Sequence, residues 1–188
     1  MPPPFRLTNE AYLRIPLGSG DSAINIFGSA WPTLTLRGTV AAGGDGSRPA
    51  FNTHVDVVGP RIVVRDPWFA LTAAPVGGLS IIDRGDPAPA YRGTLGVEHS
   101  LFINTHGAPQ PVVPRVGYGV SLGGASPVPY VSAGIDVPLA RDSAGALTLG
   151  LGYRYDEAGG HTGTLSIGIE LGDFFGTAYR GGLFAEPR

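Results

Sequence analysis

The stretch ALTLGLGYRYDEAGGHTGTLSIGIEL, residues 146–171, alternates large apolar side chains with small or polar ones. In its first half, the residues on one face of an extended chain are Leu147, Leu149, Leu151, Tyr153 and Tyr155. In its second half, the corresponding residues are Leu165, Ile167, Ile169 and Leu171. Successive side chains of a strand point to opposite faces. The stretch therefore predicts two strands with one apolar face and one sparsely filled polar face.

The same alternation recurs along most of the chain, whereas helical periodicity is absent. The strand-like runs are Leu7–Leu17, Ser22–Ser29, Thr33–Ala41, Phe51–Val57, Tyr91–Thr105, Val113–Leu122 and Tyr130–Leu139. Gly and Pro cut the middle into shorter pieces at Ile62–Val64, Trp68–Ala73 and Leu79–Ile82. Short turns separate the last runs, which predicts hairpins between neighbouring strands. We therefore expect an all-β fold, a closed antiparallel up-and-down meander barrel of about 10 strands (8–12).

The composition limits the domain organisation and the function classes. A chain of 188 residues suffices for one domain, and we expect a single barrel with residues 1–6 and 176–188 as tails outside it. The net charge of −2 offers nucleic acid no basic surface, and the absence of Cys excludes disulfides and thiolate metal sites. No run reaches the roughly 18 consecutive apolar residues of a transmembrane helix.

The contents of the polar face indicate whether the apolar face meets a core or lipid. A water-soluble sheet turns its apolar face inward, whereas a membrane barrel turns it to lipid and keeps small and charged residues inside. The polar face here is rich in glycine, which weakens a solvated strand but suits a narrow lumen. It also carries charges of both signs, which we expect to line the lumen: Arg37, Arg92, Glu98, Arg115, Asp136, Arg154 and Glu170.

Aromatic residues gather near the ends of the runs. They are Trp31, Trp68, Tyr91, Tyr130, Tyr153, Tyr155, Phe174 and Phe175. Trp and Tyr prefer the membrane–water interface, where one end of the ring is hydrated. We therefore expect these residues to form aromatic girdles.

With these patterns in view, the chain resembles the small outer-membrane β-barrel proteins of Gram-negative envelopes, the OmpA, OmpX and OmpW-like group. The resemblance rests on the stretches RVGYGVSLGG, PYVSAGIDVPLA, ALTLGLGYRYDEAGG and GTLSIGIELGDFF. It implies an outer-membrane location, membrane lipid and the barrel-assembly machinery as partners, and a further envelope protein as a candidate partner. Members of this group usually end on a strand with a terminal aromatic residue. Here Phe174 and Phe175 are followed by Gly176–Arg188, within which Ala178–Phe184 is a candidate last strand.

The sequence offers little sign of catalysis, of a metal site or of a cofactor. His54 and Asp56 share a strand face, and we interpret them as a polar pair in the lumen rather than as metal ligands. His99 and Ser100 are neighbours, so they point to opposite faces of a strand and cannot act together as base and nucleophile. A catalytic triad assembled from distant residues stays open.

These patterns favour a non-enzymatic outer-membrane barrel that acts as a structural or binding component or as a narrow small-solute pore. The start of the chain lacks the basic and apolar regions of a signal peptide, and we expect the leader to have been removed. If charged residues plug the lumen, replacing Arg115 and Arg154 by Ala should raise the conductance. One alternative is a soluble or extracellular barrel or sandwich that binds an apolar ligand or self-assembles, with Leu147, Leu149, Leu151, Ile167 and Ile169 pointing inward. The other is an outer-membrane lipid hydrolase.

Overall fold

A computed structural model describes residues 5–16, 33–41, 50–59, 62–65, 68–83, 90–103, 112–141, 145–157 and 160–171 of the chain. These residues form ten strands. The strands are β1 (Phe5–Pro16), β2 (Thr33–Ala41), β3 (Ala50–Val58), β4 (Ile62–Arg65), β5 (Phe69–Asp83), β6 (Ala90–Ile103), β7 (Val113–Leu122), β8 (Val128–Arg141), β9 (Gly145–Asp156) and β10 (Gly160–Leu171). The expected run Ser22–Ser29 and the candidate strand Ala178–Phe184 lie outside the described residues.

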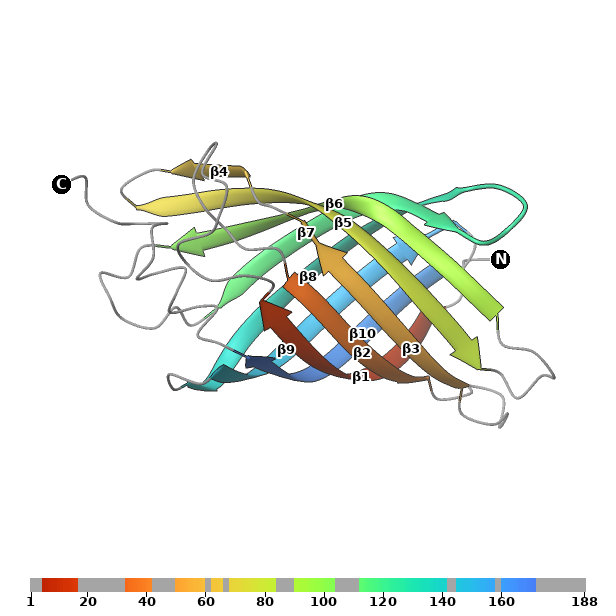
Figure 1. The fold of residues 1–188 in the computed structure, drawn as a ribbon, viewed down its shortest axis with the longest axis horizontal. Helices are drawn as coiled ribbons and strands as arrows, with labels where there is room; N and C mark the ends of the chain where they lie inside the picture. Colours follow the sequence, from red (N-terminus) through yellow and green to blue (C-terminus); the bar gives the residue numbers. More distant parts are fainter. Residues whose placement is uncertain are drawn as a thin grey trace.

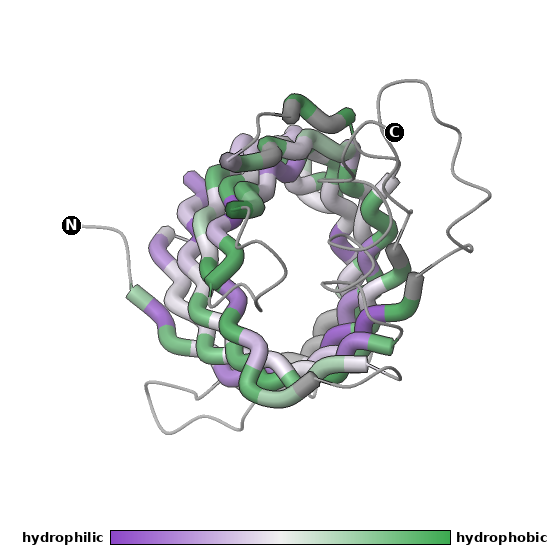
Figure 2. Tube along the Cα trace, turned by 90° about the vertical axis from the view of Figure 1, so that its left-hand side faces the viewer, coloured by the Kyte–Doolittle hydropathy of each residue, from purple (hydrophilic) through white to green (hydrophobic). Residues whose placement is uncertain are grey.

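Nine of the ten strands close into a barrel, which Figure 1 shows from the side and Figure 2 along its length. β2 pairs with both β1 and β3, and from β5 to β10 each strand pairs with the next one in the chain. β3 pairs with β5, and all of these pairs are antiparallel. The ring closes where β1 pairs with β10. The short β4 pairs only with the first part of β5 and is not part of the ring. The expected all-β closed barrel of about ten strands is confirmed.

The closing pair differs from the expectation of a wholly antiparallel barrel, because β1 and β10 run parallel. Each strand of an up-and-down ring reverses direction, so with nine strands the first and the last point the same way. Bacterial outer-membrane barrels of one chain usually have an even number of strands and close antiparallel. The parallel register matches Arg14 with Glu170, which keeps the polar faces of the two strands in phase.

Strand β5 is continuous through a Pro and two Gly residues that the sequence pattern treated as a break. Its residues up to Ala73 pair with β4, whereas those from Val76 onward pair with β3. Pro75 falls where the partner changes, so its missing N–H leaves no gap in either set of paired residues. Its carbonyl accepts a hydrogen bond from the backbone N–H of Gly59 at 2.8 Å, which links the end of β3 to this position.

The barrel is polar inside and apolar outside. Six of its polar side chains are at most 3% exposed: Thr35, Asp56, Thr72, Asp136, Thr148 and Glu170. Large apolar side chains that are more than half exposed include Leu7, Leu95, Val116, Leu139, Leu151 and Ile169. Figure 2 shows the resulting alternation of hydrophobic and hydrophilic positions along the strands. This distribution is the reverse of that in a water-soluble globular core.

In the part of the chain described here, no helix is long and apolar enough to cross a bilayer.

One inward-facing glycine makes room for an aromatic ring on the strand beside it. Gly168 of β10 is the register partner of Tyr12 of β1, and a Cβ atom at position 168 would overlap the Tyr12 ring. Tyr12 is 8% exposed, and its ring also lies 5.3 Å from the guanidinium carbon of Arg14. An aromatic ring that covers a cross-strand glycine restores packing that the glycine itself lacks. This pair therefore supports the parallel seam between β1 and β10.

Replacing Gly168 by Ala is expected to lower the free energy of unfolding by about 1–3 kcal/mol, the usual cost of an inserted methyl group in a packed interior. The matched control is Gly38→Ala on β2, since a Cβ atom there meets nothing within 4 Å. Urea unfolding of both variants under the same conditions measures the difference. Equal stability of the two variants would contradict the packing of Tyr12 on Gly168.

Candidate functional site: a polar cavity inside the barrel

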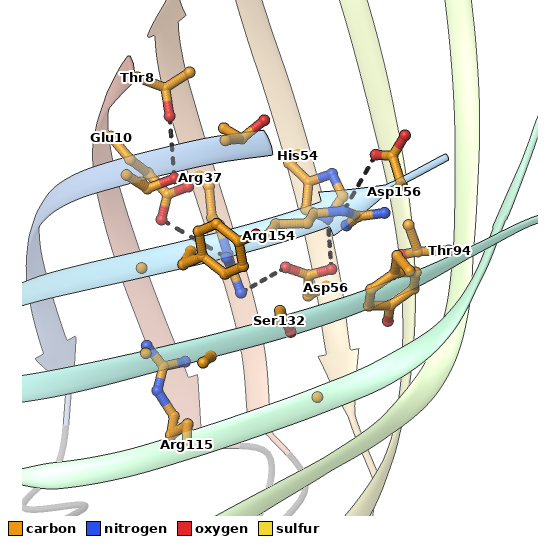
Figure 3. A pocket seen from close by; sticks show the side chains of 18 of the residues that line it. Thr8, Glu10, Arg37, His54, Asp56, Thr94, Arg115, Ser132, Arg154 and Asp156 are labelled. Atoms are coloured by element: carbon orange, nitrogen blue, oxygen red, sulfur yellow. Dashed lines mark hydrogen bonds and ion pairs between the residues drawn. The ribbon is translucent and has the colours of Figure 1, made fainter. Parts of the chain in front are cut away.

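A cavity of about 400 Å³ lies inside the barrel (Figure 3), and every strand of the ring contributes to its wall. Arg6 and Arg92 line it and are exposed, so it opens at the end where β1 and β6 begin. At the opposite end the interior holds apolar side chains that are 2–6% exposed and do not line the cavity: Val58, Ala74, Phe102 and Val113. The cavity is therefore a polar pocket at one end of the barrel.

Five charged residues from five strands form a layer across the interior. This cross-barrel ion layer consists of Glu170, Arg14, Asp136, Arg115 and Glu98, from β10, β1, β8, β7 and β6. Arg14 lies 2.5 Å from Glu170 and 3.8 Å from Asp136. Arg115 lies 2.7 Å from Asp136 and 3.6 Å from Glu98. Opposite charges thus alternate from one wall of the barrel to the other.

The ion layer includes two of the most deeply buried carboxylates. Glu170 is 0% exposed and Asp136 is 1% exposed. A buried carboxylate is tolerated only when it is paired and hydrogen-bonded, because its charge has lost hydration. Arg14 donates a hydrogen bond to Glu170, and Arg115 donates one to Asp136. The layer therefore links the strands of two opposite walls through charge-assisted contacts.

A second polar group, here called the His54 cluster, covers the wall formed by β1, β2, β3 and β5. It consists of Glu10, Arg37, Asp56, His54 and Ser80. Arg37 lies 2.9 Å from Asp56 and 3.7 Å from Glu10. The other oxygen of Asp56 lies 2.6 Å from Nε2 of His54, and Nδ1 of His54 is hydrogen-bonded to the Ser80 hydroxyl. Figure 3 shows Arg37 between Glu10 and Asp56, with His54 beside Asp56.

On the wall formed by β7, β8 and β9, Arg154 is held by three different groups. Its guanidinium carbon lies 3.9 Å from the centre of the Tyr130 ring, which is a cation–π contact. It donates a hydrogen bond of 2.5 Å to Ser121 Oγ, and its Nε lies 3.7 Å from Asp156. These contacts hold a cation in the wall of the cavity.

The structure places all seven residues expected in the lumen on the inner side of the barrel. Five of them line the cavity: Arg37, Arg92, Glu98, Arg115 and Arg154. Asp136 and Glu170 belong to the ion layer at the inner end of the cavity. The alternation of side chains in each strand was sufficient for this placement.

The residues expected in aromatic girdles divide between the two faces. Trp68, Tyr91 and Tyr153 are exposed at 67%, 59% and 41%, and the hydroxyl of Tyr153 is hydrogen-bonded to His161. Tyr155 packs against the same His161 ring at a centroid distance of 4.9 Å. The girdle prediction is wrong for Tyr130, which lines the cavity beneath Arg154. Trp31, Phe174 and Phe175 lie outside the described residues.

Tyr130 shares the inward face with Ser132, Gly134 and Asp136, because all four numbers have the same parity. The alternation therefore predicts an inward side chain at position 130, and its place near a strand end does not override that parity. His99 and Ser100 point to opposite faces as expected, with His99 stacked on exposed Tyr118 at 5.7 Å and Ser100 only 5% exposed.

Sequence reasoning missed three participants of the site. Arg14 is absent from the residues predicted to line the lumen, although it forms the ion pair with Glu170. Glu10 and Ser80 were not singled out, because their partners come from other strands whose register is set by ring closure. The even numbering of Arg14 and Glu10 places both on the same face of their strand, and this was the signal that could have identified them as lumen residues.

Comparison with known proteins adds no homologue from which a role could be transferred: no family model, curated protein or solved structure matches the chain. Within the described ranges, no group of three or more His, Asp or Glu side chains is arranged to hold a metal ion. The candidate site therefore rests on the geometry of the cavity and on the charges of its wall.

Proposed function

We propose that this chain is an integral β-barrel of the Gram-negative outer membrane and acts as a narrow, normally closed pore for small polar solutes. The observation that carries the proposal is the inverted polarity of the barrel. Acidic side chains such as Glu170 and Asp136 are buried inside, while Leu151 and Ile169 are about half exposed outside. A surface of that kind is stable against lipid and is a liability in water.

The interior supports a pore that is closed at rest. The ion layer spans the barrel in the path of any solute that enters at the mouth, and Phe102 and Val113 fill space at the far end. Small barrels are commonly occluded by their own side chains, and charged pairs in such a constriction decide what passes. A transient break between Arg14 and Asp136, which are 3.8 Å apart, would open the layer at its longest link.

The alternative of a soluble barrel that binds an apolar ligand requires an apolar interior. The structure places the side chains assigned to that interior on the outside instead: Leu147, Leu151, Ile167 and Ile169 are 38%, 51%, 50% and 54% exposed. Leu149 is half-buried on the same face. This geometry supports membrane lipid as the partner of this face, and we propose in addition that the barrel-assembly machinery inserts the chain.

Leu151→Arg tests the membrane proposal, because position 151 lies midway along β9 and faces outward. In a bilayer, an Arg at the midplane is expected to lower the free energy of unfolding by about 2–4 kcal/mol. On the surface of a water-soluble barrel the same change would stay within about 0.5 kcal/mol. The control is Gly124→Arg, an exposed position in the turn between β7 and β8.

The measurement is urea unfolding of the refolded protein in phospholipid vesicles, with the heat-modifiable gel mobility of a folded barrel as the readout. The native chain should also need detergent to remain dispersed after extraction. A native chain that stays monomeric without detergent, with Leu151→Arg as stable as the control, would refute the membrane location.

A further inference from the structure

One wall of the cavity brings together a serine, a histidine and an aspartate in a single hydrogen-bonded chain. His54 Nδ1 is hydrogen-bonded to Ser80 Oγ, and His54 Nε2 lies 2.6 Å from Asp56 Oδ1. All three side chains line the cavity. We propose that Ser80, His54 and Asp56 form a hydrolytic triad that cleaves short-chain carboxylic esters entering the barrel. This activity goes beyond the proposed pore and does not depend on it.

The hydrogen-bond inventory of the three groups assigns their roles. An ionised Asp56 only accepts hydrogen bonds, so the proton of a neutral His54 lies on Nε2 and points at the carboxylate. Nδ1 is then unprotonated and accepts the hydrogen bond that the Ser80 hydroxyl donates. Ser80 is thus the nucleophile, His54 the general base and Asp56 the group that fixes the tautomer and orientation of the imidazole. The two ring nitrogens exchange the roles they have in the serine protease triad, and each role is still filled.

The strand register holds the triad without help from loops. Ser80 of β5 is the direct partner of His54 on β3, and Asp56 is the partner of Gly78. A Cβ atom at Gly78 would overlap Asp56 Oδ1 and come within 3.0 Å of His54 Nε2. Glycine at position 78 therefore leaves the room in which the carboxylate and the imidazole meet. Arg37 binds the second oxygen of Asp56 at 2.9 Å and so holds the carboxylate in its orientation toward His54.

A cationic side chain lies on the other side of the nucleophile. Arg92 of β6 is the register partner of Ser80 and lines the same cavity. Direct cross-strand partners on one face have Cβ atoms about 4.5–5.5 Å apart, which places the guanidinium within reach of an ester bound at Ser80. Arg92 can therefore stabilise the negative oxygen that develops on the carbonyl in the transition state.

The reaction is a two-step acyl transfer to water. Ser80 Oγ attacks the ester carbonyl carbon while His54 Nδ1 takes the hydroxyl proton; the bond to the alkoxy group then breaks, and His54 returns that proton to the departing alcohol. Water attacks the acyl-Ser80 ester and gives a proton to His54, which passes it back to Ser80 Oγ as the carboxylic acid leaves. One ester and one water thus become one acid and one alcohol, with the side chains restored.

The cavity limits the substrate class. Its volume of about 400 Å³ and its wall of charged and hydroxyl side chains suit a small, polar ester. A phospholipid acyl chain would require an apolar channel beside Ser80, whereas the neighbouring inward positions are His54, Gly78 and Arg92. Entry through the mouth at Arg6 and Arg92 brings the substrate to Ser80 before it reaches the ion layer.

The test uses the full chain refolded in detergent, with p-nitrophenyl acetate as substrate and a fluorophosphonate as a covalent probe. We expect the probe to label Ser80, as read by mass spectrometry of the digested protein. Ser80→Ala should abolish both the labelling and the turnover. His54→Ala should lower the turnover about 10²–10⁴-fold, the usual contribution of a general base, and added imidazole should restore part of it. Ser126→Ala, a serine in the exposed turn between β7 and β8 and outside the cavity wall, is the control and should keep the native rate.

Three results would overturn the triad: a fluorophosphonate adduct on another serine, native turnover in Ser80→Ala, or a His54→Ala variant that imidazole leaves unchanged. Folding of each variant is checked by the gel mobility of the unheated sample, so a loss of activity with a folded barrel reports on chemistry alone. The conductance of Ser80→Ala should equal that of the native chain, which separates this proposal from the pore.

Discussion

Arg14→Met should lower the free energy of unfolding by about 3–5 kcal/mol, the usual cost of removing one partner from a buried ion pair. The variant leaves the carboxylate of Glu170, which is 0% exposed, without the guanidinium that lies 2.5 Å from it. The methionine replaces most of the lost volume, so the effect reports on charge rather than on a cavity. Urea unfolding of the refolded barrel measures it.

The double variant Arg14→Met/Glu170→Met removes both charges and should recover most of that loss. Asp136 keeps its ion pair with Arg115 at 2.7 Å when Arg14 is replaced. A suitable control is Arg6→Met, whose exposed side chain lies at the mouth of the cavity, and which should change the free energy of unfolding by less than about 0.5 kcal/mol. If the double variant were as unstable as Arg14→Met alone, the loss could not be assigned to the broken ion pair between Arg14 and Glu170.

Opening the ion layer should turn a closed barrel into a conducting one. The variant Arg115→Ala/Asp136→Ala deletes one cation and one anion that contact each other at 2.7 Å, so the net charge of the layer is unchanged. Both side chains become short, and water can then occupy the part of the barrel interior that they filled. We expect single-channel conductance in planar bilayers to rise severalfold over that of the native chain.

The control for this experiment is Arg6→Ala, which removes a charge at the mouth but none from the layer. Its conductance should match that of the native chain. A double variant that folds, as judged by gel mobility, and conducts no better than the native chain would show that the ion layer does not close the barrel. Replacing Arg154 together with Arg115 tests whether the cation on Tyr130 adds to the obstruction.

Much of the fold and part of the site follow from strand alternation alone. The period of two placed Arg115, Asp136 and Glu170 on one face, and the short turns paired β8 with β9 and β9 with β10. These features depend on residues that are close together in the chain, so they can be predicted from a single sequence. The same period also predicted that His99 and Ser100 diverge.

Contacts between strands that are distant in the chain could not be predicted from the sequence. The pairing of β1 with β10 joins residues more than 150 positions apart, as in the hydrogen bond from Arg14 to Glu170. Likewise, His54 and Ser80 are in contact only because β3 and β5 pair directly, whereas β4 lies outside the ring. Pro75 predicted a break in the strand, because the change of partner strand at this position is not evident from the neighbouring residues in the sequence. The ion layer and the His54 cluster both depend on such non-local pairings.

The odd number of strands in the ring has a consequence for topology across a membrane. Since β1 enters at the same end from which β10 starts, Phe5 and Leu171 lie at opposite ends of the barrel (Figure 1). A barrel with an even number of strands returns its chain to the side on which it began. In a membrane, as proposed for this chain, a peptide tag ahead of β1 and one behind β10 would therefore face different compartments, and antibodies applied to intact cells should reach only one of them.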